Sequence, residues 1–223
     1  MYRRSDPNKT EFIAKHVREG SKELDILKYL HTKRPHSPHV MIEGILSISR
    51  EWLILPKLYT ICYQRFMDSG GDSCRVQLGW GLIKGLAYLH KHKIAHRDIK
   101  PDNLVCDNDF RLQIIDFDAA IHVQDENTLI DRYRGTKDWT APEIGTVEGP
   151  TPMYSPIKAD RWSCGRVLLH HIMVVGKGDS NLRKFAQKLM ANDPQQRPSL
   201  IAWREFLGEG SMKLLDSKKP RFK

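Results

Sequence analysis

Apolar and polar positions alternate near the start of the chain, and this pattern predicts short strands there. Residues 11–17 are short and partly alternating, which is typical of a strand. Residues 21–33 instead place apolar side chains at near-helical spacing, and the two prolines that follow predict the end of that helix. Residues 40–49 and 50–56 have the pattern of two more strands.

The remainder of the chain is dominated by helical spacing. Residues 73–93 carry apolar side chains along one side and predict a long helix. Three further helices are predicted at residues 161–175, 181–192 and 199–207. Two short apolar runs within residues 103–118 are separated by a polar stretch, which predicts a hairpin. Residues 119–156 are polar, rich in Gly, Pro and Thr and without periodicity, and a loop of this length is usually functional.

These elements predict an α+β chain that forms a single domain over residues 1–223. Residues 1–57 form a strand-rich front, and residues 58–208 form a mostly helical back. Residues 209–223 are a basic tail that we expect to fray. The hinge between front and back is predicted at residues 56–58.

Composition narrows the class of protein. The chain has 223 residues, of which 40% are hydrophobic, so it can bury a core and a wholly disordered chain is excluded. The formal net charge of +9 invites a nucleic-acid partner, but the basic residues are spread out without aromatic interleaving or a reader motif, so we expect none. The four Cys form no CxxC pair, which favours a reducing compartment.

Targeting signals are not visible in the sequence. The first residues carry charges where a signal peptide has an apolar core, and the longest apolar runs are far too short to span a membrane. We therefore expect an intracellular protein, cytoplasmic or nuclear, with no membrane partner.

One segment carries a recognisable chemistry. Residues 94–105 read IAHRDIKPDNLV, and residues 114–117 read IIDF. His96, Arg97, Asp98 and Asn103 match the H-R-D-x-x-x-x-N catalytic loop at full spacing, so the chain resembles a eukaryotic protein kinase. Lys100 within this segment resembles the serine/threonine branch of the family.

The resemblance implies a two-lobed protein-kinase-like fold with a reduced, β-rich N-lobe and a mainly helical C-lobe. It implies transfer of the ATP γ-phosphate to serine or threonine hydroxyls of protein substrates by a monomer. Asp98 is then the base, and Lys100 holds the γ-phosphate as charge builds. Asn103 and Asp116 offer hard oxygen ligands, which suit Mg²⁺.

The front half matches the family less closely. Lys15 stands where the family places the lysine that contacts the α- and β-phosphates, and Glu23 where it places the acid that pairs with that lysine. An ordinary strand lysine and an ordinary helix-surface acid are the simpler alternatives. Alignment of residues 52–58 with the fifth strand of the family makes Leu55 the gatekeeper, and Lys57 and Leu58 the hinge backbone offered to adenine.

Further matches lie downstream. Glu143 ends an Ala-Pro-Glu tripeptide and is expected to pair with Arg197. Asp160 is expected to hydrogen-bond the backbone of the catalytic loop. The Arg97 that precedes Asp98 is typical of kinases in which a phosphate can hold the activation segment, the stretch between Asp116 and Glu143. Thr128 lies in this stretch and is an available acceptor for such a phosphate. The simpler interpretation of Thr128 is an exposed loop residue without a role.

Three departures from the family pattern leave the activity open. No Gly precedes Lys15, so the glycine-rich cover of the phosphates is missing and the chain resembles an N-terminally truncated member. Asp118 replaces the Gly of the D-F-G motif, and only 37 residues separate Asp160 from Arg197, too few for the usual docking helix. The alternatives to an active kinase are a pseudokinase-like binding or scaffold module and a truncated gene product without activity.

Overall fold

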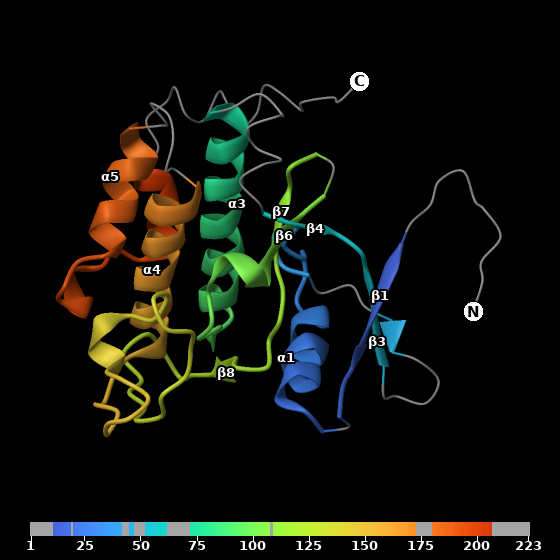
Figure 1. Ribbon diagram of the computed structural model, residues 1–223, viewed down its shortest axis with the longest axis horizontal. Coiled ribbons are helices and arrows are strands. Elements are labelled where there is room, and N and C mark those ends of the chain that lie inside the picture. The colour runs from blue at the N-terminus through green and yellow to red at the C-terminus, as the bar shows by residue number, and fades with distance from the viewer. Residues whose placement is uncertain are drawn as a thin grey trace.

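A computed structural model describes residues 11–18, 20–41, 45–46, 52–61, 72–107, 109–172 and 180–206. A strand-rich front and a mostly helical back lie side by side, with helix α1 between the front sheet and the rest (Figure 1). The α+β arrangement predicted from the sequence is confirmed. The tail predicted over residues 209–223 lies outside the described residues.

The front sheet is antiparallel, with the order β1-β3-β2 among the described residues. Strands β1 (Phe12–His16) and β3 (Trp52–Pro56) confirm two of the predicted strands, and Lys15 lies opposite Leu53 in their register. Strand β2 covers only Ile45–Leu46, within the longer strand predicted over residues 40–49. Most of that longer stretch lies outside the described residues.

Helix α1 (Lys22–His31) begins where the sequence predicted a helix. The Ser21 hydroxyl caps it by accepting a hydrogen bond from the Leu24 N–H. Apolar residues of its inner face are buried, and Leu30 is fully buried. Glu23 lies in the first turn, where the partial positive charge of the helix N-terminus favours a carboxylate. The helix therefore presents Glu23 toward the front sheet.

Helix α3 (Asp72–Lys91) is the centre of the main core. Its leucines Leu78, Leu82, Leu86 and Leu89 have 0% exposure, so the buried surface is wider than the single stripe predicted from the sequence. The chain enters this region from the front sheet through strand β4 (Tyr59–Thr60). The hairpin predicted over residues 103–118 is confirmed, with β4, β6 (Leu104–Cys106) and β7 (Leu112–Ile114) in one sheet.

The loop predicted over residues 119–156 contains short regular pieces. Strand β8 (Ile121–His122) pairs with β5 (Ile94–Ala95), and a 3-10 turn, η2, covers Pro142–Ile144. A second 3-10 turn, η1 (Pro101–Asn103), leads into β6. These pieces were not predicted because two or three residues carry no readable periodicity.

The helices after the loop differ from the prediction at their ends. Helix α4 (Pro156–Val167) begins five residues before the predicted start, because Ser155 caps it and a Pro occupies its first turn. It continues as a π-helical turn, η3 (Leu168–Ile172). Helix α5 covers Ser180–Leu189, followed by the 3-10 turn η4 (Pro194–Gln196).

The helix predicted over residues 199–207 is not an α-helix. The structure has 3-10 turns there, η5 (Leu200–Phe206), with a kink at Ala202. Apolar spacing alone does not distinguish the two helix types. None of the described helices combines the length and the hydropathy that crossing a bilayer requires.

Candidate active site

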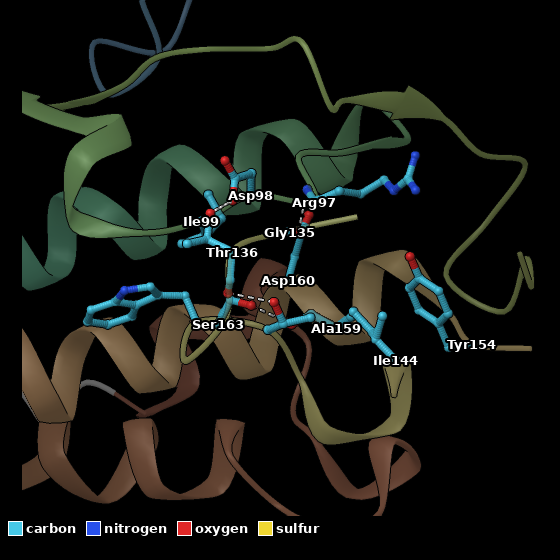
Figure 2. Close-up of a pocket in the computed structure, with 12 residues that line it drawn as sticks. Arg97, Asp98, Ile99, Gly135, Thr136, Ile144, Tyr154, Ala159, Asp160 and Ser163 are labelled. Atoms are coloured by element: carbon cyan, nitrogen blue, oxygen red, sulfur yellow. Dashed lines mark hydrogen bonds between the residues drawn. The ribbon is translucent and has the colours of Figure 1, made fainter. Parts of the chain in front are cut away.

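A buried carboxylate of α4 holds the backbone of the loop that carries Asp98. Asp160 is 2% exposed, and its two oxygens accept hydrogen bonds from the backbone N–H groups of His96 at 2.7 Å and Arg97 at 2.8 Å. Asp160 and Arg97 are both labelled in Figure 2. Arg97 has a φ of 70°, a strained backbone that such bonds can maintain. The predicted bond between Asp160 and the catalytic-loop backbone is confirmed.

His96 fixes the same loop from inside. The ring is fully buried, its Nε2 lies 3.0 Å from the carbonyl oxygen of Ile115, and its Nδ1 accepts from the Asp98 N–H at 3.3 Å. Because Nδ1 accepts, the ring proton is assigned to Nε2, where it is donated to Ile115. His96 therefore links the catalytic loop to the chain just before Asp116.

The Asp98 carboxylate is the centre of a polar cluster. The Lys100 ammonium lies 2.9 Å from its Oδ2, and the Thr136 hydroxyl donates to its Oδ1 at 2.8 Å. Lys100 also donates to the Thr136 hydroxyl at 2.8 Å, and the Asn103 side-chain nitrogen donates to Oδ2 at 3.1 Å. Asp98, Thr136 and Asp160 line the same pocket (Figure 2). Asp98 is thus oriented by three side chains while its own side chain stays 17% exposed.

Thr136 is a site residue that sequence reasoning missed as a partner of Asp98. It lies 38 positions from Asp98, so nothing in local spacing predicts the contact. The Gly-Thr pair before the Ala-Pro-Glu tripeptide was the available signal. Gly135 has a φ of +124°, and a Cβ there would lie 2.9 Å from the Thr140 hydroxyl, so the turn requires glycine.

Lys15 forms a second polar cluster at the front. Its ammonium lies 2.8 Å from Glu23, 2.7 Å from Asp116 and 3.3 Å from Asp118. Glu23 is 3% exposed and also accepts from the backbone N–H of Phe117 at 3.2 Å. The structure therefore brings Lys15, Glu23 and Asp116 together, residues from one strand, one helix and one loop.

The pKa values of this cluster follow from burial and pairing. Burial lowers the pKa of Lys15, but hydrogen bonds and charge from Asp116 and Glu23 outweigh it and raise that pKa above its ordinary value. Burial raises the pKa of Asp116, and Lys15 outweighs this and lowers it. Burial keeps the pKa of Glu23 above its ordinary value although Lys15 opposes the shift.

The two predicted metal ligands lie at the end of one hairpin. The backbone N–H of Ile115 donates to the carbonyl oxygen of Asn103 at 3.0 Å, which holds the flank of Asp116 against Asn103. The Asn103 nitrogen is used by Asp98, so the amide oxygen is the atom that this side chain offers a cation. A carboxylate and an amide oxygen are hard ligands, so the donor set fits Mg²⁺.

The predicted adenine contacts lie at the connection between front and back. Leu55 is half-buried against the main core, and Lys57 and Leu58 join β3 to β4. The Lys57 N–H donates to the carbonyl oxygen of Glu11 at 2.8 Å, and its ammonium pairs with the Glu11 carboxylate at 2.6 Å. The backbone donor of Lys57 is therefore already used, and the roles of Leu55, Lys57 and Leu58 toward a nucleotide stay predictions.

The predicted pairing of Arg197 with Glu143 is confirmed. The Arg197 side chain is fully buried, and its two terminal nitrogens donate to the Glu143 oxygens at 2.5 and 2.7 Å. Such a bidentate pair fixes the end of the segment that follows Asp116.

Comparison with known proteins agrees with this geometry. Residues 70–177 match the protein kinase domain family. CBL-interacting serine/threonine-protein kinase 7 of Arabidopsis thaliana is 35% identical over 116 residues, which are 50% of this chain and 26% of that protein. Serine/threonine-protein kinase GRIK1 of the same plant is 32% identical over 144 residues, 54% of this chain and 35% of the relative.

A fungal relative gives the same result. Serine/threonine-protein kinase chk1 of Schizosaccharomyces pombe is 29% identical over 136 residues, 60% of this chain and 26% of the relative. The chain thus spans about a third or less of the length of these relatives. Asp98, Asn103, Asp116 and Glu143 all lie within the matched residues 70–177 and take the positions described above. The family match over residues 70–177 and the serine/threonine-protein kinase relatives therefore support membership of the protein kinase superfamily.

Proposed function

We propose that the chain transfers the γ-phosphate of ATP to serine or threonine hydroxyls of protein substrates. The observation that carries the proposal is the Asp98 cluster, in which one carboxylate is held by Lys100 at 2.9 Å and by Thr136 at 2.8 Å. Phosphoryl transfer requires mainly that the protein position the reacting groups and neutralise their charge, and the Asp98 cluster can do both.

Asp98 acts as the base in this proposal. Its carboxylate accepts the proton of the substrate hydroxyl as the oxygen attacks the γ-phosphorus, and the bond between the γ-phosphorus and the bridging oxygen breaks to release ADP. Lys100, which bridges Asp98 and Thr136, offers its ammonium to the charge that builds on the transferred group. The Thr136 hydroxyl keeps the Asp98 carboxylate oriented through the step.

Mg²⁺ would be held by Asn103 and Asp116. When bound, the ion neutralises charge on the phosphates of ATP. Before nucleotide binds, Lys15 lowers the pKa of Asp116, so this carboxylate is already ionised when the ion arrives. The Asn103 amide is kept oriented by its two bonds to Asp98, at 2.9 Å to the carbonyl oxygen and 3.1 Å to the carboxylate.

Lys15 binds the α- and β-phosphates in this proposal. It then exchanges its contacts with Asp116 and Asp118 for phosphate oxygens and keeps its bond to Glu23. Glu23 is suited to remain, because it is 3% exposed, whereas the side chains of Asp116 and Asp118 are 36% and 64% exposed.

The proposal is tested by phosphate transfer from labelled ATP in the presence of Mg²⁺. Purified wild-type chain should label a generic protein substrate, and Asp98→Asn should label it at least about a hundredfold more slowly. The matched control is Glu148→Gln, a similar loss of one negative charge at an exposed position. Equal labelling by wild type and Asp98→Asn contradicts the proposal.

A second candidate function is a binding module that does not use ATP. One observation favours it: the Lys15 ammonium already contacts three carboxylates, an arrangement that competes with phosphate oxygens. This candidate predicts no rise in melting temperature on addition of Mg-ATP, since a ligand stabilises a protein only when it binds the native state. A rise that disappears in Lys15→Met favours the kinase.

A further inference from the structure

Helix α4 contains a buried arginine that the proposed reaction does not use. The side chain of Arg161 is 4% exposed, and a guanidinium stays charged at any physiological pH. Its NH2 group donates to the carboxylate of Glu126, and its NH1 group donates to the carbonyl oxygen of Arg197 at 3.2 Å. A buried charge needs such a partner, so the position of Glu126 is tied to this helix.

Glu126 belongs to residues 116–143, which we call the activation segment. The start of α4 holds the same part of the segment by two more contacts. The Ser155 hydroxyl donates to the carbonyl oxygen of Glu126 at 2.6 Å, and the buried Lys158 ammonium donates to the Asn127 side chain at 2.8 Å. Two neighbouring residues of the segment are therefore anchored by three side chains of one helix end.

A second arginine holds the segment on both sides of Glu126. The Arg97 guanidinium donates to the carbonyl oxygens of Ala119 at 3.4 Å and Arg132 at 3.0 Å. Thr128, the available phosphate acceptor, bonds within its own turn: its hydroxyl accepts from the Asp125 N–H at 3.1 Å. The segment is thus held by carbonyl and carboxylate acceptors of the unmodified chain.

These anchors matter to the active site because the segment carries Thr136. From Glu126 the chain passes Arg132 and reaches Thr136, whose hydroxyl contacts both Asp98 and Lys100 at 2.8 Å. A shift of the segment would remove this hydroxyl from Asp98 and leave the base less well oriented.

We propose that Glu126 and Arg161 are positioning residues of the phosphotransfer site: their ion pair holds the activation segment so that Thr136 meets Asp98, and no phosphate on the segment is required. The inference rests on the proposed kinase function for its effect on rate. The anchoring of the segment stands on the contacts alone and is measured separately.

The anchoring is tested by hydrogen exchange of the amides in residues 119–136. Arg161→Met removes the buried charge together with the pair, so the melting temperature should stay close to that of wild type while exchange in this segment rises by about tenfold. Glu126→Gln should raise exchange in the same residues. Asp131→Asn, an exposed acid in the same segment, should leave it unchanged. Unchanged exchange in both Arg161→Met and Glu126→Gln overturns the proposal.

The effect on the reaction is tested with the same variants. Arg161→Met should lower kcat by about tenfold and leave the KM for ATP unchanged, because Lys15 and Asp116 lie outside the anchored part. Phosphatase treatment of wild type should not change its rate. A rate that phosphatase abolishes overturns the proposal. If wild type transfers no phosphate, the proposed function fails, and the exchange experiment still decides whether Glu126 and Arg161 hold the segment.

Discussion

The front sheet and the helical back present their parts of the site in different ways. Strand β1 is exposed on both faces, with Phe12 at 47% and Ile13 at 49%, and Lys15 is placed by ion pairs to three carboxylates. Helix α3 is buried around most of its surface, and Asp98 stands on a loop whose backbone is bonded to the buried Asp160. The back therefore holds its residues rigidly, whereas the front holds Lys15 by contacts that can be exchanged.

This difference matches the two tasks of the proposed reaction. A base must be held in a productive geometry, so Asp98 benefits from a dry and tightly bonded support. A phosphate-binding ammonium must release its resting partners, so Lys15 benefits from exposed carboxylates that compete only moderately. We infer that the back determines the rate of transfer and that the front determines nucleotide affinity.

The largest expected effect is a difference in stability loss when a side chain is truncated in the packed back and in the exposed front. Leu86→Ala removes a fully buried side chain from α3 and should lower the free energy of unfolding by about 2–5 kcal/mol. Ile13→Ala on the front sheet should lower it by about 0.5 kcal/mol or less, since this side chain is 49% exposed. Urea unfolding of both variants measures the difference, and similar losses contradict the comparison.

A second effect tests the bonded support of the back. Glu143→Gln leaves the buried Arg197 without a charged partner and should cost about 3 kcal/mol in the free energy of unfolding. Glu148→Gln, the same change at an exposed position, should cost about 0.5 kcal/mol or less. A loss in Glu143→Gln as small as in this control would show that the Arg197 pair contributes little to the rigidity of the back.

The smallest effect is a pH dependence of stability that arises from His90 on α3, in the back. Burial lowers the pKa of His90 below its ordinary value of 6.5, although the pair with Asp160 opposes the shift. Below pH 6.5 His90 binds a proton in the unfolded chain but stays neutral in the native chain. The free energy of unfolding therefore decreases as the pH is lowered, until the pH reaches the native pKa of His90. The slope is at most about 1.4 kcal/mol per pH unit.

The variant His90→Gln isolates this contribution. As the pH is lowered from 7 to 5, the free energy of unfolding of this variant should fall less steeply than that of wild type. The reason is that unfolding of the variant no longer includes the uptake of a proton by residue 90. His39→Gln serves as the comparison, since burial also lowers the pKa of His39, which lies beside the hairpin rather than beside Asp160. A slope unchanged by His90→Gln would mean that His90 takes up its proton over the same pH range in the native and unfolded states, and would contradict the prediction.

Much of the candidate site could be predicted from the sequence, because several of its residues lie close together along the chain. The catalytic loop follows the long helix, and the hairpin between Asn103 and Asp116 returns one predicted ligand to the other. Lys15 and Glu23, eight residues apart, were assigned from their resemblance to the paired lysine and acid of the family, and the structure joins them at 2.8 Å.

Contacts between distant segments could not be predicted in the same way. Thr136 reaches Asp98 across 38 positions, and Glu126 reaches Arg161 across 35. Both contacts depend on the path of a segment without periodicity, which carries no local signal of where it packs. For a related reason the sequence predicted a helix over residues 199–207 but not its 3-10 type, since apolar spacing does not report the hydrogen-bond pattern.

The division of tasks between front and back is tested most directly by comparing Lys15→Met with Asp98→Asn. Nucleotide binding is measured as the rise in melting temperature with Mg-ATP, and transfer as labelling of a protein substrate. Asp98→Asn should keep the rise and lose transfer by about a hundredfold or more, whereas Lys15→Met should lose the rise. A full rise in Lys15→Met, or undiminished transfer in Asp98→Asn, would contradict the account.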